Sequence, residues 1–246
     1  MINLKSSTEL KAIAKEKSLD KYGTLILANI LIFAIQFIVM TIATVSNPGN
    51  LVSYFINKII FIIVNILVCI LVSGKAYLYM NLIYSQTVST DDIFFGFKQH
   101  PSKAVVIQAV FVVADLFVSV PLSILYDILL SGYSLNAATG VLFALAFGIV
   151  VNVYVYLTYS QAFFLLHDFP DRSAKELLAL SKKMMKGSRL HLLYIRISFI
   201  PLILLGVITL FVPLFWISVY RYATFTAFYQ DLIVQYSNRT QPVEGA

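Results

Sequence analysis

Three ionisable side chains lie inside long apolar stretches of this sequence: Asp115, Arg196 and Arg221. A charge near the centre of a membrane-spanning helix costs about 3 kcal/mol or more unless it is paired, so such residues are candidates for a functional site. Asp115 and Arg221 fall at similar distances from the ends of their apolar stretches. We therefore predict that they form a buried ion pair.

The apolar stretch before His167 is unusually rich in hydroxyl and aromatic groups, and it supplies Tyr156, Tyr159 and Gln161. These side chains would line a polar cavity together with the predicted ion pair. A structural interpretation stands beside this functional one. In it, the ion pair only fixes helix packing, and Arg196 extends its charge to the membrane surface.

The sequence carries no signature of a common enzyme active site: it has no HExxH, no GxSxG, no P-loop and no Gly-rich nucleotide fingerprint. Its three histidines, His100, His167 and His191, lack the i,i+4 or Glu-x-x-His spacing of a zinc site. Cys69 is the single cysteine. We expect no catalytic residues, no metal and no cofactor, and therefore no enzymatic activity.

A basic amphipathic helix is predicted after Ser173, because Ser173 and Glu176 have the spacing of a capping box. Such a helix lies in the membrane interface and attracts anionic lipid headgroups. The residues predicted to contact headgroups are Lys175, Lys182, Lys183, Lys186 and Arg189. The net charge of +6 is distributed around apolar stretches, which indicates a membrane surface rather than nucleic acid as the partner.

Apolar residues make up 59% of the chain and charged residues only 12%, which is typical of a membrane protein. About 20 apolar residues are needed for one helical crossing. The sequence predicts crossings at residues 23–45, 54–79, 104–125 and 138–166, and two short ones within 190–232 that turn between Gly206 and Pro213. The expected fold class is an all-α polytopic membrane protein with six transmembrane helices.

Capping-box spacing occurs three times, starting at Ser6, Ser89 and Ser173, at separations of 83 and 84 residues. Each box would open an interfacial helix that precedes an antiparallel pair of spans. In the second such helix, Ile93 and Phe97 are expected to share a face. We predict one membrane domain, residues 1–246, built from three pseudo-repeats at 6–88, 89–172 and 173–246.

The basic residues predict the orientation of this domain. Of the 18 Lys and Arg residues, fifteen lie in segments on one side of the six predicted spans, whereas Lys58 alone lies on the other side. Positive charge is concentrated on cytoplasmic segments. Both termini and all three capped helices are therefore expected to face the cytoplasm from the plasma membrane.

Several short motifs resemble those of a bacterial family of integral membrane proteins, domain of unknown function 975. They are a Pro after acidic residues at Pro170, a Met-Lys-Gly segment within 181–187, the start of a span at 195–200, a closing Ala-Phe-Tyr-x-Asp-Leu at 227–232, and a Gly-Phe-Lys turn at 96–98. This resemblance covers nearly the whole chain. It implies six spans in a bacterial plasma membrane and carries no implied activity.

These observations predict a non-enzymatic membrane protein that has a permease-like or membrane-homeostasis role and acts on lipid or small amphipathic molecules. Its expected partner is the lipid bilayer with its anionic headgroups. The alternative is an interaction or scaffold protein, or one that confers immunity to a membrane-active toxin. A permease-like role requires a polar cavity, whereas a scaffold requires a dry interior and an exposed docking face.

Overall fold

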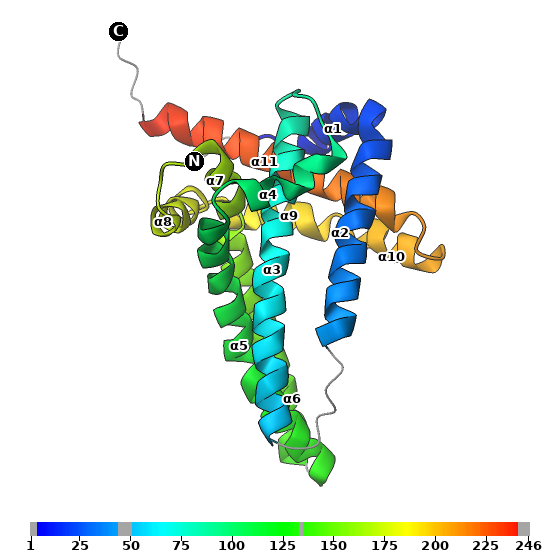
Figure 1. Cartoon of the computed structure of the whole chain (residues 1–246), viewed down its shortest axis with the longest axis vertical. Helices are drawn as coiled ribbons and strands as arrows, with labels where there is room; N and C mark the ends of the chain where they lie inside the picture. Colours follow the sequence, from blue (N-terminus) through cyan, green and yellow to red (C-terminus); the bar gives the residue numbers. More distant parts are fainter. Residues whose placement is uncertain (1–3, 44–50, 133–134, 241–246) are drawn as a thin grey trace.

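The computed structural model describes residues 4–43, 51–132 and 135–240, and the regular secondary structure in these ranges is helical throughout. In chain order the elements are α1 (Ser7–Ser18), η1 (Leu19–Lys21), α2 (Tyr22–Ala43), α3 (Leu51–Ile83), η2 (Thr90–Phe94), α4 (Phe95–Lys98), α5 (Pro101–Ser131), α6 (Leu135–Tyr159), α7 (Ala162–Asp168), α8 (Ala174–Met184), α9 (Arg189–Ile197), α10 (Ile200–Ile208) and α11 (Leu214–Thr240). Figure 1 shows that α2, α3, α5 and α6 extend along the long axis of the molecule.

Five helical segments are long and apolar enough to cross a membrane: Ser7–Val39, Phe55–Ile83, Pro101–Ser131, Ala138–Asp168 and Arg189–Ile208. They contain most of the first four predicted spans and the first half of the third predicted hairpin; residues 44–45 of the first predicted span lie outside the described residues. Large apolar side chains point outward from these helices, including Phe33, Phe117 and Phe143, which are 62%, 69% and 78% exposed. Such a surface suits lipid rather than water, so the chain has the helices of a multi-span membrane protein.

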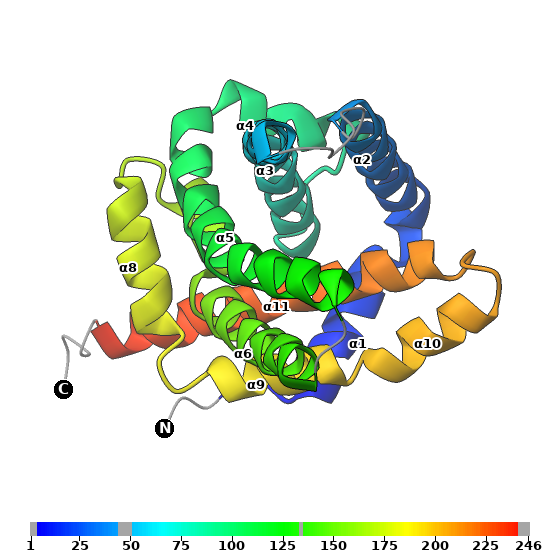
Figure 2. The same cartoon turned by 90° about the horizontal axis from the view of Figure 1, so that it is seen from below.

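The third apolar hairpin differs in direction from the long helices. Its turn lies where the sequence predicts it, because α10 ends at Ile208 and α11 begins at Leu214. However, α9, α10 and α11 run across one end of the assembly formed by α3, α5 and α6. Figure 2 looks along the long axis of the molecule, and it shows α11 lengthwise and α3 nearly end-on. Helix α11 is not among the five candidate spans, and the predicted sixth crossing is not confirmed.

All three predicted capping boxes are formed. The backbone N–H of Ser6 donates to Glu9 Oε2 at 2.7 Å, that of Ser89 to Asp92 Oδ2 at 3.0 Å, and that of Ser173 to Glu176 Oε2 at 2.8 Å. The Ser side chains accept backbone N–H groups of the first turn in return, which satisfies donors that a helix start leaves unpaired. The capped segments α1, α4 and α8 lie toward the same end of the molecule (Figure 1).

The second capped segment is not one amphipathic helix, because it consists of the short elements η2 and α4. Ile93 is fully buried while Phe97 is 47% exposed, so the expectation that they share a face is wrong. The reason is close packing against α3. A Cβ atom added to Gly74 would lie 1.8 Å from the carbonyl oxygen of Ile93, and one added to Gly96 would lie 2.3 Å from that of Ile70.

The buried core lies at this same end of the molecule, around the middle of α11. Ala223, Phe228 and Tyr229 of α11 are fully buried, and α11 packs against α1, α2 and α3. Leu10 of α1 and Leu177 of α8 belong to the same apolar cluster as Phe228. The apolar faces of the capped segments are therefore buried in protein, which fixes their position relative to α11.

Candidate functional site

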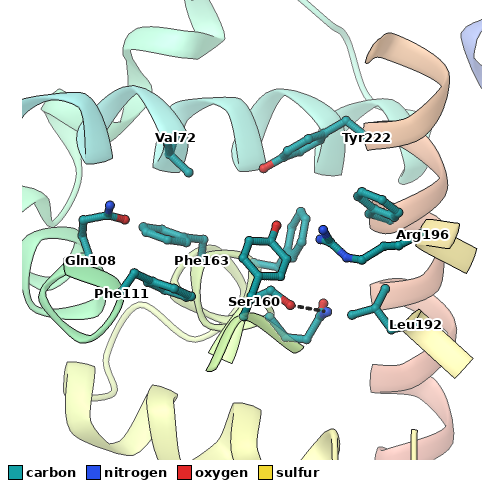
Figure 3. A pocket seen from close by; sticks show the side chains of 12 residues that line it. Val72, Gln108, Phe111, Ser160, Phe163, Leu192, Arg196 and Tyr222 are labelled. Atoms are coloured by element: carbon teal, nitrogen blue, oxygen red, sulfur yellow. Dashed lines mark hydrogen bonds between the residues drawn. The ribbon is translucent and has the colours of Figure 1, made fainter. Parts of the chain in front are cut away.

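A cavity of about 400 Å³ lies beside the break between α6 and α7 (Figure 3). Helix α6 ends at Tyr159 and α7 begins at Ala162, so Ser160 and Gln161 stand at the break. The cavity is lined by Val72, Gln108, Phe111, Tyr156, Ser160, Gln161, Phe163, Phe164, Leu192, Arg196, Tyr222 and Phe225. Its walls are mostly aromatic and aliphatic with a few polar groups, so it differs from the polar cavity that the sequence predicts. Such a lining is typical of sites for small ligands.

Arg196 is the charged residue of the cavity wall, and aromatic rings hold its guanidinium group. Its Cζ atom lies 3.9 Å from the ring centre of Tyr156 and 4.4 Å from that of Phe225. Cation–π contacts of this kind position the charge without neutralising it. Its Nε atom is buried without a hydrogen-bond partner. Figure 3 shows the guanidinium group directed into the cavity, toward the space beside the Tyr222 hydroxyl.

Gln161 supplies the second unsatisfied group. Its side chain is 2% exposed, its Nε2 donates to Ser160 Oγ at 3.1 Å, and its Oε1 has no partner. A buried polar atom without a partner costs about 1–3 kcal/mol. The cavity therefore offers an unpaired donor at Arg196 and an unpaired acceptor at Gln161, which a bound polar ligand would satisfy.

Two further cations lie near Arg196. The positive charges of Arg196 and Arg221 are close enough to interact unfavourably, and Lys75 interacts with Arg221 in the same way. Lys75 Nζ lies 4.6 Å from the ring centre of Tyr222. Within the part of the chain that the structure describes, none of these three side chains has a carboxylate partner. The field at the cavity is therefore positive and favours an anion.

The lining residues have the chemistry of binding more than that of catalysis. Ser160 has a hydroxyl group, but no His, Asp, Glu or Lys lines the cavity to act as its general base. Over residues 4–43, 51–132 and 135–240, no group of three or more His, Cys, Asp or Glu side chains is arranged to hold a metal. What this arrangement can do chemically is to bind a molecule that has an anionic head and an apolar body.

The structure brings together three of the six residues that the sequence singles out for an intramembrane site: Tyr156, Gln161 and Arg196. Asp115 and Tyr159 do not line the cavity, and Arg221 lies near it with an exposed side chain. No ion pair joins Asp115 to Arg221 in the described structure. On the same helix as Asp115, Ser119 accepts a hydrogen bond at 3.2 Å from Nζ of Lys58 in α3.

The residues predicted to contact lipid headgroups lie on α8 and at the start of α9. Lys175, Lys182, Lys183 and Lys186 are exposed. Arg189 is partly buried and its Cζ lies 4.9 Å from the ring centre of Tyr154, while Lys183 Nζ lies 5.8 Å from that of Tyr236. The charges are thus available on the surface, and the apolar side of α8 is buried through Leu177 and Met184.

The histidines are engaged in packing. His167 Nε2 lies 2.8 Å from the carbonyl oxygen of Ser73 and 3.2 Å from its Oγ, and the His191 ring is stacked on Phe228 at 5.9 Å. His100 occupies the position before α5, with a left-handed backbone (φ 50°). These contacts connect α7 to α3 and α9 to α11, and the Nε2 atom of His191 is buried without a hydrogen-bond partner.

Sequence reasoning missed Lys75, Gln108 and Tyr222. Lys75 near the end of an apolar stretch has the pattern of a residue that reaches the membrane surface, yet it contacts the rings of Tyr79 and Tyr222. Gln108 had a usable signal, because it stands three residues before Phe111 and therefore shares its helix face. No sequence signal distinguished Tyr222, since a tyrosine in an aromatic-rich stretch of a membrane protein is common.

Comparison with known proteins identifies one related family. The family model described as protein of unknown function (DUF975) matches residues 1–235, which is nearly the whole chain. Neither the curated proteins nor the solved structures yielded a match. The family description agrees with the resemblance seen in the sequence motifs.

Proposed function

We propose that this chain, which belongs to the DUF975 family of proteins of unknown function, binds the anionic head of a lipid or small amphipathic molecule in the cavity at Arg196. The observation that carries this proposal is that Arg196 faces an apolar cavity with no carboxylate partner among the described residues. The role is permease-like or in membrane homeostasis, and no reaction is catalysed. The unpaired Gln161 Oε1 supports the same assignment, because it would accept a hydrogen bond from a ligand hydroxyl group.

The proposal includes a location and an orientation. The protein resides in a bacterial plasma membrane with both termini in the cytoplasm. This is supported by the fifteen Lys and Arg residues on one side of the predicted spans and by the shared end of α1, α4 and α8. Six crossings would put the α10–α11 turn on the outer side, whereas the crossing direction of α9–α11 favours a hairpin that stays within the inner half of the bilayer.

The test is binding of alkyl phosphates to the purified protein in a neutral amphipol, measured by isothermal titration calorimetry. Decyl phosphate should bind, and decanol, which has the same chain without the charge, should bind far more weakly. Arg196→Gln should weaken decyl phosphate binding about 10-fold or more, as expected when a charge-assisted hydrogen bond is lost. The matched control is Arg172→Gln, which removes an exposed Arg outside the cavity.

Two outcomes would overturn this function. Equal affinity for decyl phosphate and decanol would show that charge is not recognised. Equal loss of affinity in Arg196→Gln and Arg172→Gln would show that net charge, and not the cavity, attracts the anion. Circular dichroism of each variant verifies that its helical content is unchanged.

A second candidate function has one observation in its favour. The exposed lysines of α8 form a basic face that a protein partner with an acidic surface would recognise, as expected of a scaffold or toxin-immunity protein. Charge reversal of Lys182 and Lys183 to Glu would abolish such docking. It would leave decyl phosphate binding at Arg196 unchanged, so the two functions are separable.

A further inference from the structure

A second hollow lies on the other side of two residues that line the cavity. It has a volume of about 430 Å³ and lies between α6 and α9–α10, lined by Asn152, Val153, Tyr156, Leu157, Leu193, Arg196, Ile197 and Ile200. Tyr156 and Arg196 belong to both linings. The cavity and this hollow, which we call the α6–α9 groove, are therefore separated by the stacked pair of Tyr156 and Arg196.

The α6–α9 groove opens on the lipid-facing surface. Val153, Ile197 and Ile200 are 38%, 52% and 48% exposed, and all three lie in candidate membrane spans. Apart from Asn152 and the shared pair, the lining is aliphatic. Hydrocarbon is the neighbour that such a surface meets in a bilayer.

The partition between the two spaces is a contact that can open. Tyr156 and Arg196 meet by stacking at 3.9 Å, and no hydrogen bond or ion pair joins their side chains in the described structure. A cation–π contact leaves the N–H groups of the guanidinium able to donate charge-assisted hydrogen bonds to an anion. An anion that engages Arg196 would therefore compete with the Tyr156 ring for the guanidinium group.

We propose that the ligand is an anionic lipid that enters from the bilayer between α6 and α9, with its headgroup in the cavity on Arg196 and an acyl chain in the α6–α9 groove. This inference rests on the proposed function and specifies its ligand and route. Charge complementarity selects the head, since Lys75, Arg196 and Arg221 lack carboxylate partners among the described residues. The aliphatic lining selects the tail, and its exposure to lipid makes passage through water unnecessary.

The experiment is a chain-length series, from butyl to decyl phosphate, on the amphipol-exchanged protein and on Ile197→Trp, which fills the groove. Full burial of each methylene raises affinity about fourfold. The wild-type affinity should therefore rise steeply with chain length, whereas Ile197→Trp should bind butyl phosphate normally and gain little from longer chains. Ile208→Trp is the matched control, because Ile208 is 81% exposed and lies outside the groove.

The outcomes separate this inference from the function on which it rests. If Arg196→Gln weakens binding but Ile197→Trp keeps the steep dependence on chain length, the function holds and the groove is refuted as the tail site. If Arg196→Gln has no specific effect, the function itself fails.

A second measurement, photolabelling, uses the wild-type protein and therefore does not require any variant to fold. Decyl phosphate carrying a diazirine at its tail end should label residues 152–157 and 193–200 on irradiation. Labelling restricted to α2 or to the α5 surface would overturn the proposed route.

Discussion

The hydroxyl group of Tyr229 in α11 donates to Asp168 Oδ2 at 2.5 Å, at the end of α7. Tyr84, just after α3, donates to the same oxygen at 3.1 Å. The neighbouring His167 contacts Ser73 of α3, and the carbonyl oxygen of Pro170 accepts from Lys103 of α5. The segment 167–170 therefore joins α3, α5, α7 and α11 at one point, which brings together two of the motifs that resemble the family, at Pro170 and 227–232.

Tyr229→Phe should destabilise the protein by about 1.5–3 kcal/mol, because it removes a buried hydrogen bond to a carboxylate. Tyr229 is fully buried, so water cannot replace the lost donor. Thermal unfolding of the detergent-solubilised protein, followed by circular dichroism, measures the change. Tyr194→Phe is the control, since Tyr194 is 64% exposed, and an equal loss there would contradict the assignment.

Gly74→Ala should prevent normal packing of α3 against η2, because its Cβ would fall 1.8 Å from a backbone oxygen that cannot rotate away. Overpacking of this kind costs about 1–3 kcal/mol or more. Gly23→Ala is the opposite case, because nothing lies within 4 Å of its added Cβ, and alanine favours a helix. We expect a lower midpoint temperature of thermal unfolding for Gly74→Ala, and an unchanged or higher one for Gly23→Ala. The reverse order would refute the close approach of Gly74 to the Ile93 backbone.

The capping box of α8 should depend on pH. The backbone N–H and the hydroxyl of Ser173 hydrogen-bond to the Glu176 carboxylate and hold its pKa below the usual value. A carboxyl group with a lowered pKa in the folded state stabilises that state above its unfolded pKa, and this contribution is lost as the pH falls through the lowered value. Hydrogen exchange of α8 at pH 7 should therefore be faster in Ser173→Ala than in the wild type. The expected factor is about fivefold, because loss of an N-cap typically costs about 1 kcal/mol.

At a pH below the lowered pKa of Glu176, the wild type and Glu176→Gln should exchange at similar rates in α8. A wild-type advantage over Glu176→Gln that persists in acid would show that ionisation of Glu176 is not involved. Exchange in α2, which packs against α3, η2 and α11, serves as the internal reference.

Single cysteines in a Cys69→Ala background should report the membrane topology in intact cells. Gly132→Cys, between α5 and α6, should react with a membrane-impermeant maleimide added outside, whereas Lys182→Cys should react only after permeabilisation. Leu210→Cys tests the third hairpin. Leu210 and Phe211 are 83% and 59% exposed and apolar, so a hairpin that crosses the other helices should bury this turn in lipid, unlabelled from outside. External labelling of Leu210→Cys would establish the sixth crossing instead.

The sequence by itself determined the local features of this protein. Apolar stretches fixed the candidate spans, because a helix satisfies its own backbone groups in lipid and needs only length and hydrophobicity. The three capping boxes followed from Ser and acidic residues three positions apart, since both partners lie within one turn. The resemblance to the family was likewise visible in short motifs, and two of these, at Pro170 and 227–232, lie beside the contact between Asp168 and Tyr229.

Only the tertiary structure decided which distant residues meet. Arg196 is stacked on Tyr156 from α6 and Phe225 from α11. Residue spacing in the sequence does not predict these contacts, because the partners lie on different helices. Similar distances from the ends of their apolar stretches made Asp115 and Arg221 look like partners. However, α11 runs across one end of the molecule, and Arg221 lies near Arg196 and Lys75. The direction of the third hairpin was decided by the burial of α11 against α1, α2 and α3. Hydropathy is a property of single segments, whereas a site depends on how the faces of several helices are turned toward one another.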